Sequence, residues 1–440
     1  MFPNGSPFYL SLHQPPVALT QPNPSSEVLS CWRLVRGKTG QEKEGGASFD
    51  GNKSKVTTIS PFEYNSKPGD SAITYLQGIK GWDRPGTFLL VGANNSPGPT
   101  PLGFAYVGPL NSVANPAFNG SSGSGTWYPI SVPTTFGAAG TSVYGPDKLA
   151  AGLVNYVGAY TRDLGGASPS SSNPSIVGFT YTGSVDGSTK GGYRKVQGRT
   201  YEGVDGTYTF VHSVDGGLAV GNTDLAALDG RTGYFSLKST PFIVSLANGS
   251  QTPIRFASND MDDSDFITHT AYGIWNNGNS SYTIAGGSGA VLEGGNGVTV
   301  GSGYLIDYDS ITGQFAHYTE FNYQNRSSGD LVTHFEGIYR DVDGDYWLPA
   351  TSVALNPQGD LAIASVVKVE RSRSGGFQAR AEWRPLTVRE SATGVESVLS
   401  TGNSLFGNTM VGFANYPTSS NGVTQADFVI HGNWLPQSFL

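Results

Sequence analysis

The residues best placed to do chemistry form a column of mixed side chains that recurs about every 65 residues. Six short segments align on their last positions, which lie 67, 68, 60, 64 and 70 residues apart. The position two before the end is apolar in all six segments, whereas the penultimate position is mixed and largely polar. Because side chains alternate along a strand, the mixed column occupies one face. Its members are Gln77, Tyr144, His212, Tyr272, Glu336 and Phe406.

This column predicts a ring of side chains around a central funnel, and it forms the expected ligand-binding site. His and Glu are the groups in this region that suit general acid and base catalysis. The weak catalytic candidates are therefore Glu336, His334 and His212. Hydrogen bonding between neighbouring units is the alternative role of the same side chains.

A second candidate site is the alternating acidic run Asp341, Asp343 and Asp345, which has the oxygen donors of a calcium loop. The twelfth position from Asp341 is Ser352, so the bidentate acid of an EF-hand is missing. A tight Asp-Gly hairpin is the alternative explanation of this run. Calcium is the only cofactor that the sequence suggests, since the lone Cys31 excludes a Cys-rich zinc module.

Each segment must lie on a strand, because a turn and then an apolar run ending in a small residue follow it. Two further strands complete each unit, as in Gly303–Ile306 and Phe315–Tyr318 of the fourth. Four strands per unit predict an all-β fold, a six-bladed β-propeller, with seven blades or two β-sandwich domains as alternatives. Residues 1–45 form an expected Pro/Ser-rich N-terminal tail. Residues 46–440 form the propeller, and residues 46–62 are expected to close the ring against the last blade.

One unit carries a family resemblance. Tyr282-Thr-Ile-Ala-Gly-Gly287 is followed by Gly303-Tyr-Leu-Ile-Asp-Tyr308, so an apolar strand ends in Gly-Gly and an aromatic strand follows. This arrangement resembles kelch-type and related bacterial extracellular propellers. The resemblance implies a fold class and no activity.

The amino-acid composition limits the classes of partner that the protein is expected to bind. The net charge is −8, and no Lys/Arg cluster is present that would neutralise a run of phosphates, so nucleic acid is not an expected partner. No apolar run reaches the ~18 residues of a membrane span, and no signal peptide is visible. A surface rich in Ser, Thr, Asn and Gly is typical of exported proteins, so the expected location is extracellular or periplasmic.

These observations lead to three functional hypotheses. The first is an exported, non-catalytic propeller that binds carbohydrate or another surface ligand, with Trp82 and Trp275 beside turns as exposed stacking platforms. The second is a glycan-cleaving hydrolase or lyase that uses Glu336 with Asp341, Asp343 or His334. The third is a structural or adhesive surface protein. The sequence leaves enzyme activity undecided, with the balance toward a binding protein.

Overall fold

The computed structural model describes residues 73–434 with gaps at 96–101, 111–124, 151, 166–169, 171, 190, 202, 225–238, 257–266, 292–297, 327–330, 355–360, 390–393, 418–422 and 433. The predicted tail at 1–45 and the predicted closing strands at 46–62 lie outside the described residues. Within them the chain is all-β, as expected, with two short 3-10 turns at Thr134–Phe136 and Tyr323–Asn325. This described part contains no helix long and apolar enough to cross a membrane.

The strands follow one another in antiparallel groups that we call units 1 to 6. Unit 1 comprises β1 (Ile73–Gly81), β2 (Thr87–Asn95), β3 (Leu102–Pro109) and β4 (Thr126–Ile130). Unit 2 comprises β5 (Ala138–Lys148), β6 (Leu153–Arg162), β7 (Ile176–Ser184) and β8 (Tyr193–Val196). Unit 3 comprises β9 (Tyr208–Asp215), β10 (Leu218–Asp224), β11 (Ser239–Ser245) and β12 (Gln251–Pro253).

The second half repeats this order. Unit 4 comprises β13 (Ile267–Gly278), β14 (Ser281–Val291), β15 (Val298–Asp309) and β16 (Gln314–Phe321). In unit 5 the first strand is interrupted, giving β17 (Leu331–Phe335), β18 (Tyr339–Arg340), β19 (Tyr346–Ala354), β20 (Leu361–Val369) and β21 (Glu382–Pro385). In unit 6 the described strands are β22 (Leu399–Phe406), β23 (Thr409–Pro417) and β24 (Val423–His431).

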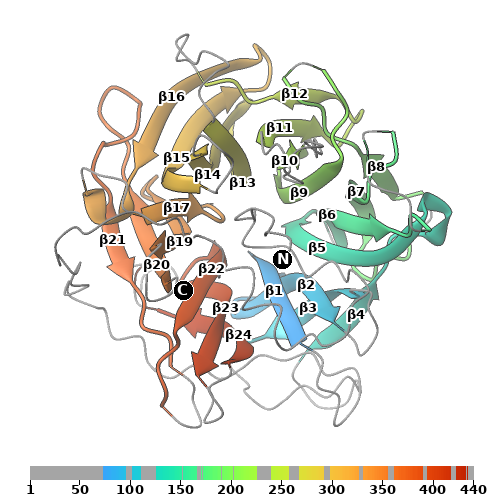
Figure 1. Cartoon of the computed structure of the whole chain (residues 1–440), viewed down its shortest axis with the longest axis horizontal. Coiled ribbons are helices and arrows are strands. Elements are labelled where there is room, and N and C mark those ends of the chain that lie inside the picture. The colour runs from blue at the N-terminus through green and yellow to red at the C-terminus, as the bar shows by residue number, and fades with distance from the viewer. Residues whose placement is uncertain are drawn as a thin grey trace, which may run out of the picture.

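The units surround a central axis, with the first strand of each unit innermost (Figure 1). β1 packs beside β5, β5 beside β9 and β9 beside β13; contacts between β14 and β17, β19 and β22, and β22 and β1 complete the circuit. This radial arrangement of antiparallel sheets is a β-propeller. The apolar core lies between units; for example, Leu89 and Val91 of unit 1 pack with Val143 and Phe179 of unit 2.

A β-bulge in the first strand recurs at the same place in five units. The pairing register with the second strand skips one residue of the first strand between Leu76 and Gly78, Val143 and Gly145, Val211 and Ser213, Ala271 and Gly273, and Gly402 and Ser404. A bulge re-aims the extra side chain and leaves it outside the regular ladder. In unit 5 the interruption after Phe335 replaces the bulge.

This bulge explains why a glycine ends the apolar run of the second strand in most units. A Cβ on Gly92, Gly158, Gly221 or Gly412 would lie 2.0 Å from a backbone oxygen of the first strand, and one on Gly286 would lie 1.9 Å from it. These backbones approach too closely for any side chain. Unit 5 has Ala350 at this position, opposite Phe335, where its first strand stops.

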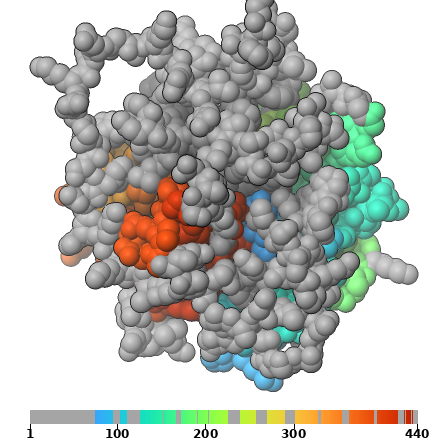
Figure 2. Space-filling model, turned by 60° about the horizontal axis from the view of Figure 1, so that its bottom comes forward, coloured from blue at the N-terminus to red at the C-terminus, as the bar shows by residue number. Residues whose placement is uncertain are grey.

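Units 1 and 6 are in contact, so the described units follow one another around the axis and the last meets the first. The blue and orange-to-red segments lie side by side in both views (Figure 1, Figure 2). Asn403 Nδ2 donates to the Leu76 carbonyl at 2.6 Å, and the Leu76 N–H donates to Asp427 Oδ2 at 3.2 Å. Side chains of unit 6 thus satisfy backbone groups of β1 at this junction.

Candidate functional site

The extra residue of each bulge points to the axis, and the structure brings these residues together around one cavity. We call this set the bulge ring; its members are Gln77, Tyr144, His212, Tyr272, Glu336 and Asn403. Five of them belong to the mixed column expected from the sequence. Glu336 occupies the equivalent place in unit 5, where its N–H donates to the Pro349 carbonyl at 2.9 Å.

The sixth member is a correction. The sequence alignment placed Phe406 in this column, but the bulge of unit 6 lies between Gly402 and Ser404, which makes Asn403 the equivalent residue. Phe406 still lines the cavity, three residues farther along β22. The alignment slipped because Gly402 stands where the other units have an apolar residue, and Leu405-Phe406-Gly407 imitates the expected pattern.

The bulge ring is buried, and its aromatic members pack on one another. The His212 ring stacks on Tyr144 at 5.4 Å between centroids and meets the edge of Tyr272 at 4.6 Å. Burial raises the pKa of both tyrosines, and the charge of Glu336 contributes to the shift of Tyr272. Both phenols are therefore neutral at physiological pH.

A hydrogen-bond chain leads from the ring into unit 3. His212 Nε2 lies 2.7 Å from Asn222 Oδ1, and Asn222 Nδ2 donates to Asp224 Oδ1 at 3.2 Å. Because an amide oxygen only accepts, His212 Nε2 carries the hydrogen. Burial raises the pKa of Asp224 to about 6. The chain fixes the imidazole in the wall of the cavity.

The cavity that the bulge ring lines is small. Its volume is about 30 Å³, room for about two water molecules. A ligand larger than this volume would lie across the end of the cavity.

A second ring lies three residues beyond the bulge ring, where each first strand turns into its hairpin. We call it the mouth ring; its members are Lys80, Asp147, Asp215, Trp275, Tyr339 and Phe406. Units 1 to 3 contribute the charged side chains and units 4 to 6 the aromatic ones. The ring is thus divided into a charged half and an aromatic half.

Lys80 reaches across the mouth. Its ammonium forms an ion pair with Asp215 Oδ1 at 3.1 Å and lies 4.9 Å from the centroid of the Trp275 ring. Lys80 belongs to unit 1, whereas Asp215 and Trp275 belong to units 3 and 4, which do not adjoin it. The Lys80 side chain therefore spans the axis and links the two halves of the ring.

The two aspartates of the charged half differ in environment. Asp215 accepts a hydrogen bond from Lys80 Nζ on Oδ1 and from the Asn276 N–H on Oδ2 at 2.7 Å. The side chain of Asp147 is buried, with 6% of the residue exposed. Burial raises the pKa of Asp147 to about 6, despite the opposing charge of Lys80 and a hydrogen bond from the Gly216 N–H.

The aromatic half is continuous. Trp275 meets Tyr339 edge to face at 5.3 Å, and Tyr339 meets Phe406 in the same geometry at 5.2 Å. All three side chains are half-buried, so each keeps part of its surface open.

Two other residues expected at the site lie apart from the cavity lining. His334 stacks on Tyr272 at 5.7 Å but does not line the cavity. Trp82 packs against the core between units 1 and 2, with Lys148 Nζ 5.6 Å from its ring centroid.

The acidic run at 341–345 is a hairpin in the structure. Asp341 accepts hydrogen bonds from the Asp345 N–H at 2.9 Å and from Trp347 Nε1 at 2.8 Å, and Asp345 pairs with Lys368. Asp343 lies in the turn between them. Among the described residues, no group of three or more His, Cys, Asp and Glu side chains is placed to hold a metal ion.

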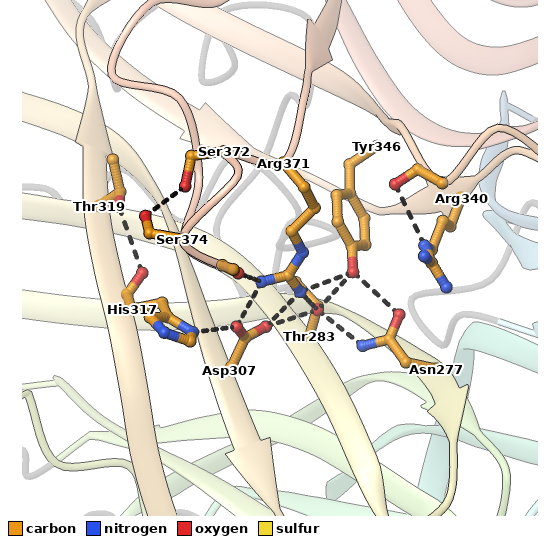
Figure 3. Close-up of polar contacts among 12 residues, drawn as sticks. Asn277, Thr283, Asp307, His317, Thr319, Arg340, Tyr346, Arg371, Ser372 and Ser374 are labelled. Carbon is orange, nitrogen blue, oxygen red and sulfur yellow. Dashed lines mark hydrogen bonds and ion pairs between the residues drawn. The ribbon is translucent and has the colours of Figure 1, made fainter.

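A separate polar cluster joins units 4 and 5 (Figure 3). Arg371 donates through Nη2 to Asp307 Oδ1 at 2.7 Å and to the Tyr346 hydroxyl at 2.8 Å. His317 Nδ1 lies 2.8 Å from the other oxygen of Asp307. These contacts occupy both oxygens of Asp307, so the cluster connects the units.

Comparison with known proteins gives only distant likenesses. No family model matches the chain, a kelch family included, and no curated protein matches it. Among solved structures, the chain is similar to a PL25 ulvan lyase at a TM-score of 0.42 and 11% identity, over 85% of this chain and 84% of that one.

It is also similar to a GH43 protein from Bacillus licheniformis at a TM-score of 0.33 and 12% identity, over 76% of this chain and 58% of that one. The N-terminal domain of Nup159 gives a TM-score of 0.30 and 8% identity, over 86% and 99%. These likenesses carry no argument about activity.

Proposed function

We propose that the chain is a six-bladed propeller that binds carbohydrate across the mouth ring. The observation that carries this proposal is the aromatic half, in which Trp275, Tyr339 and Phe406 form one row beside polar and charged groups. Aromatic faces bind the apolar face of a sugar ring, while neighbouring polar groups meet its hydroxyls. In this proposal each of the six units is one blade.

The charge of the mouth favours a neutral glycan. Lys80 is the only cation of the mouth ring, and Asp215 already neutralises it. An anionic sugar would therefore lack a free cation here and would face Asp147 in addition. Hydroxyl groups, in contrast, can donate to the carboxylates and accept from the ammonium.

An extracellular or periplasmic location accords with this function, because such a protein meets polysaccharides outside the cytosol. The location is part of the proposal. Fractionation of the producing cells tests it, and recovery of the protein only from the cytosol would contradict it.

A glycan array followed by isothermal titration tests the binding proposal. We expect array signals from neutral oligosaccharides, and a Kd at least about ten-fold higher for Trp275→Ala and Tyr339→Ala, since each substitution removes about 1.4 kcal/mol or more of stacking and burial. Trp82→Ala is the matched control because Trp82 is a half-buried tryptophan outside the mouth ring.

Calcium is included as a second arm of the same array, because the sequence suggested it. The structure gives no reason for a calcium effect at the mouth ring. Unchanged binding by the Trp275 and Tyr339 variants, or no signal from any glycan with or without calcium, would refute the proposed site.

A further inference from the structure

The charged half of the mouth ring has a composition that stacking does not require. Lys80, Asp147 and Asp215 come from three different units, yet they meet beside Trp275, where the proposed sugar would lie. A binding surface needs hydroxyl-directed hydrogen bonds but no pair of neighbouring carboxyl groups. A glycosidase needs such a pair.

We propose that the mouth ring cleaves neutral glycans hydrolytically, with Asp147 as the general acid and Asp215 as the general base. This inference rests on the proposed function, since it assumes that the glycan lies across the aromatic half. It assigns catalysis to residues other than Glu336, His334 and the 341–345 carboxylates, which were the sequence candidates.

The geometry brings the two carboxylates to one place. The Asp147 carboxylate accepts the N–H of Gly216, the residue that immediately follows Asp215. Gly216 has φ of +59°, and a Cβ there would lie 2.1 Å from Asn276 Nδ2. The positive φ and the close approach of Asn276 favour glycine in the β9–β10 turn, whose backbone N–H reaches Asp147.

Their environments divide the roles. Asp215 accepts a hydrogen bond from Lys80 Nζ on Oδ1 at 3.1 Å and from the Asn276 N–H on Oδ2 at 2.7 Å, so both of its oxygens have donors. Asp147 is contacted by Asn155 Nδ2 at 3.5 Å, and Asn155 accepts from Thr182 at 2.8 Å, so its neighbours on that side are neutral. Burial raises the pKa of Asp147 to about 6, which leaves a proton available near that pH. The charged or titratable groups that act on it are Lys80, Asp215 and, on unit 4, Tyr282.

The hydrolytic step needs no reagent other than water. The Asp147 proton passes to the glycosidic oxygen as the bond from that oxygen to C1 breaks and its electron pair stays on the oxygen. A water oxygen bonds to C1, and its proton passes to the Asp215 carboxylate. Proton exchange with solvent then restores both groups. The cavity behind Lys80 has room for about two waters close to this site.

The test measures release of shorter sugars from xylohexaose, cellohexaose, mannohexaose and maltohexaose by anion-exchange chromatography. We expect the wild type to cleave at least one of them. Asp147→Asn and Asp215→Asn should each lower kcat at least about 100-fold. Asp83→Asn is the matched control, because Asp83 is an exposed carboxylate that pairs with Lys148 on the neighbouring hairpin. It should keep full activity.

Titration of the Asp147→Asn variant with the cleaved oligosaccharide separates catalysis from folding and binding. We expect unchanged Kd with lost turnover, and in the wild type a kcat that falls as pH rises through about 6, because the acid must hold its proton. Binding without cleavage by the wild type would overturn the hydrolase while leaving the binding function intact. No binding at all would overturn both, and turnover retained by Asp147→Asn would overturn its role as the acid.

Discussion

Replacing Gly158 by alanine tests whether the bulge dictates the recurring glycine. The added Cβ would lie 2.0 Å from the Ser142 carbonyl oxygen, and the Phe179 ring at 2.8 Å blocks the other side. Neither neighbour is the flexible end of a side chain. The pair of strands β5 and β6 must therefore open by roughly 1 Å or more before ordinary contact is restored.

The cost follows from what this opening breaks. Two ladder hydrogen bonds next to the bulge are each worth about 1 kcal/mol, and overpacking a close-packed site costs about 1–3 kcal/mol. We expect Gly158→Ala to lower the free energy of unfolding by about 3–5 kcal/mol. This is a large part of the total for a marginally stable domain, which is about 5–15 kcal/mol.

Urea denaturation followed by tryptophan fluorescence measures this loss as a lower midpoint at an unchanged slope. Gly402→Ala is the control, because its Cβ would meet the Met410 thioether at 3.1 Å, the movable end of a flexible side chain, and Pro349 Cβ at 3.4 Å, an ordinary contact distance. Its effect should stay within about 1 kcal/mol. A Gly158→Ala midpoint equal to that of Gly402→Ala would refute the explanation.

Three further predictions concern buried charge. Burial raises the pKa of Asp224 from 3.8 to about 6, so the unfolding free energy falls by about 3 kcal/mol as pH rises from about 4 to about 6. Urea denaturation of Asp224→Asn across this pH range should lack that fall. A pH profile equal to that of the wild type would contradict this prediction. Burial lowers the pKa of His269 from 6.5 to about 4, so this residue contributes with the opposite sign, and stability is lost as pH falls from about 6.5 to about 4. His269→Gln should remove that loss when urea denaturation is repeated across this pH range. Arg371→Met removes the guanidinium that contacts both oxygens of the Asp307 carboxylate and should cost about 3 kcal/mol. His317→Asn, on the exposed side of the same carboxylate, should cost under about 1 kcal/mol. Equal losses in thermal or urea denaturation would contradict the account of this cluster.

The repeat and most of the bulge ring were predictable because one local rule produces both. The bulge forces a glycine or other small residue at fixed places, and that spacing is visible in the sequence at Gly78, Gly145 and Gly273. The same rule failed in unit 6. Gly402 leaves the packing position without a side chain, and the Met410 thioether lies 3.1 Å from where its Cβ would be.

The sequence singled out Trp275 and Phe406 as ligand-binding candidates, but it did not predict the mouth ring as a set, for two physical reasons. Its members share a position but no chemical type, so a column of Lys80, Asp147 and Trp275 shows no pattern until the units are aligned correctly. The contacts that connect the members of the ring also run across the axis, as between Lys80 and Asp215, which are 135 residues apart in the sequence. Local periodicity carries no information about such pairs.

A crystal structure with the neutral oligosaccharide that binds best tests the central claim most directly. The Asp147→Asn variant would keep that sugar intact in the crystal. We predict one sugar ring stacked on Trp275 or Tyr339, with the chain crossing the mouth near Lys80. A sugar bound on the outer strands, or between two units away from the mouth ring, would contradict the account.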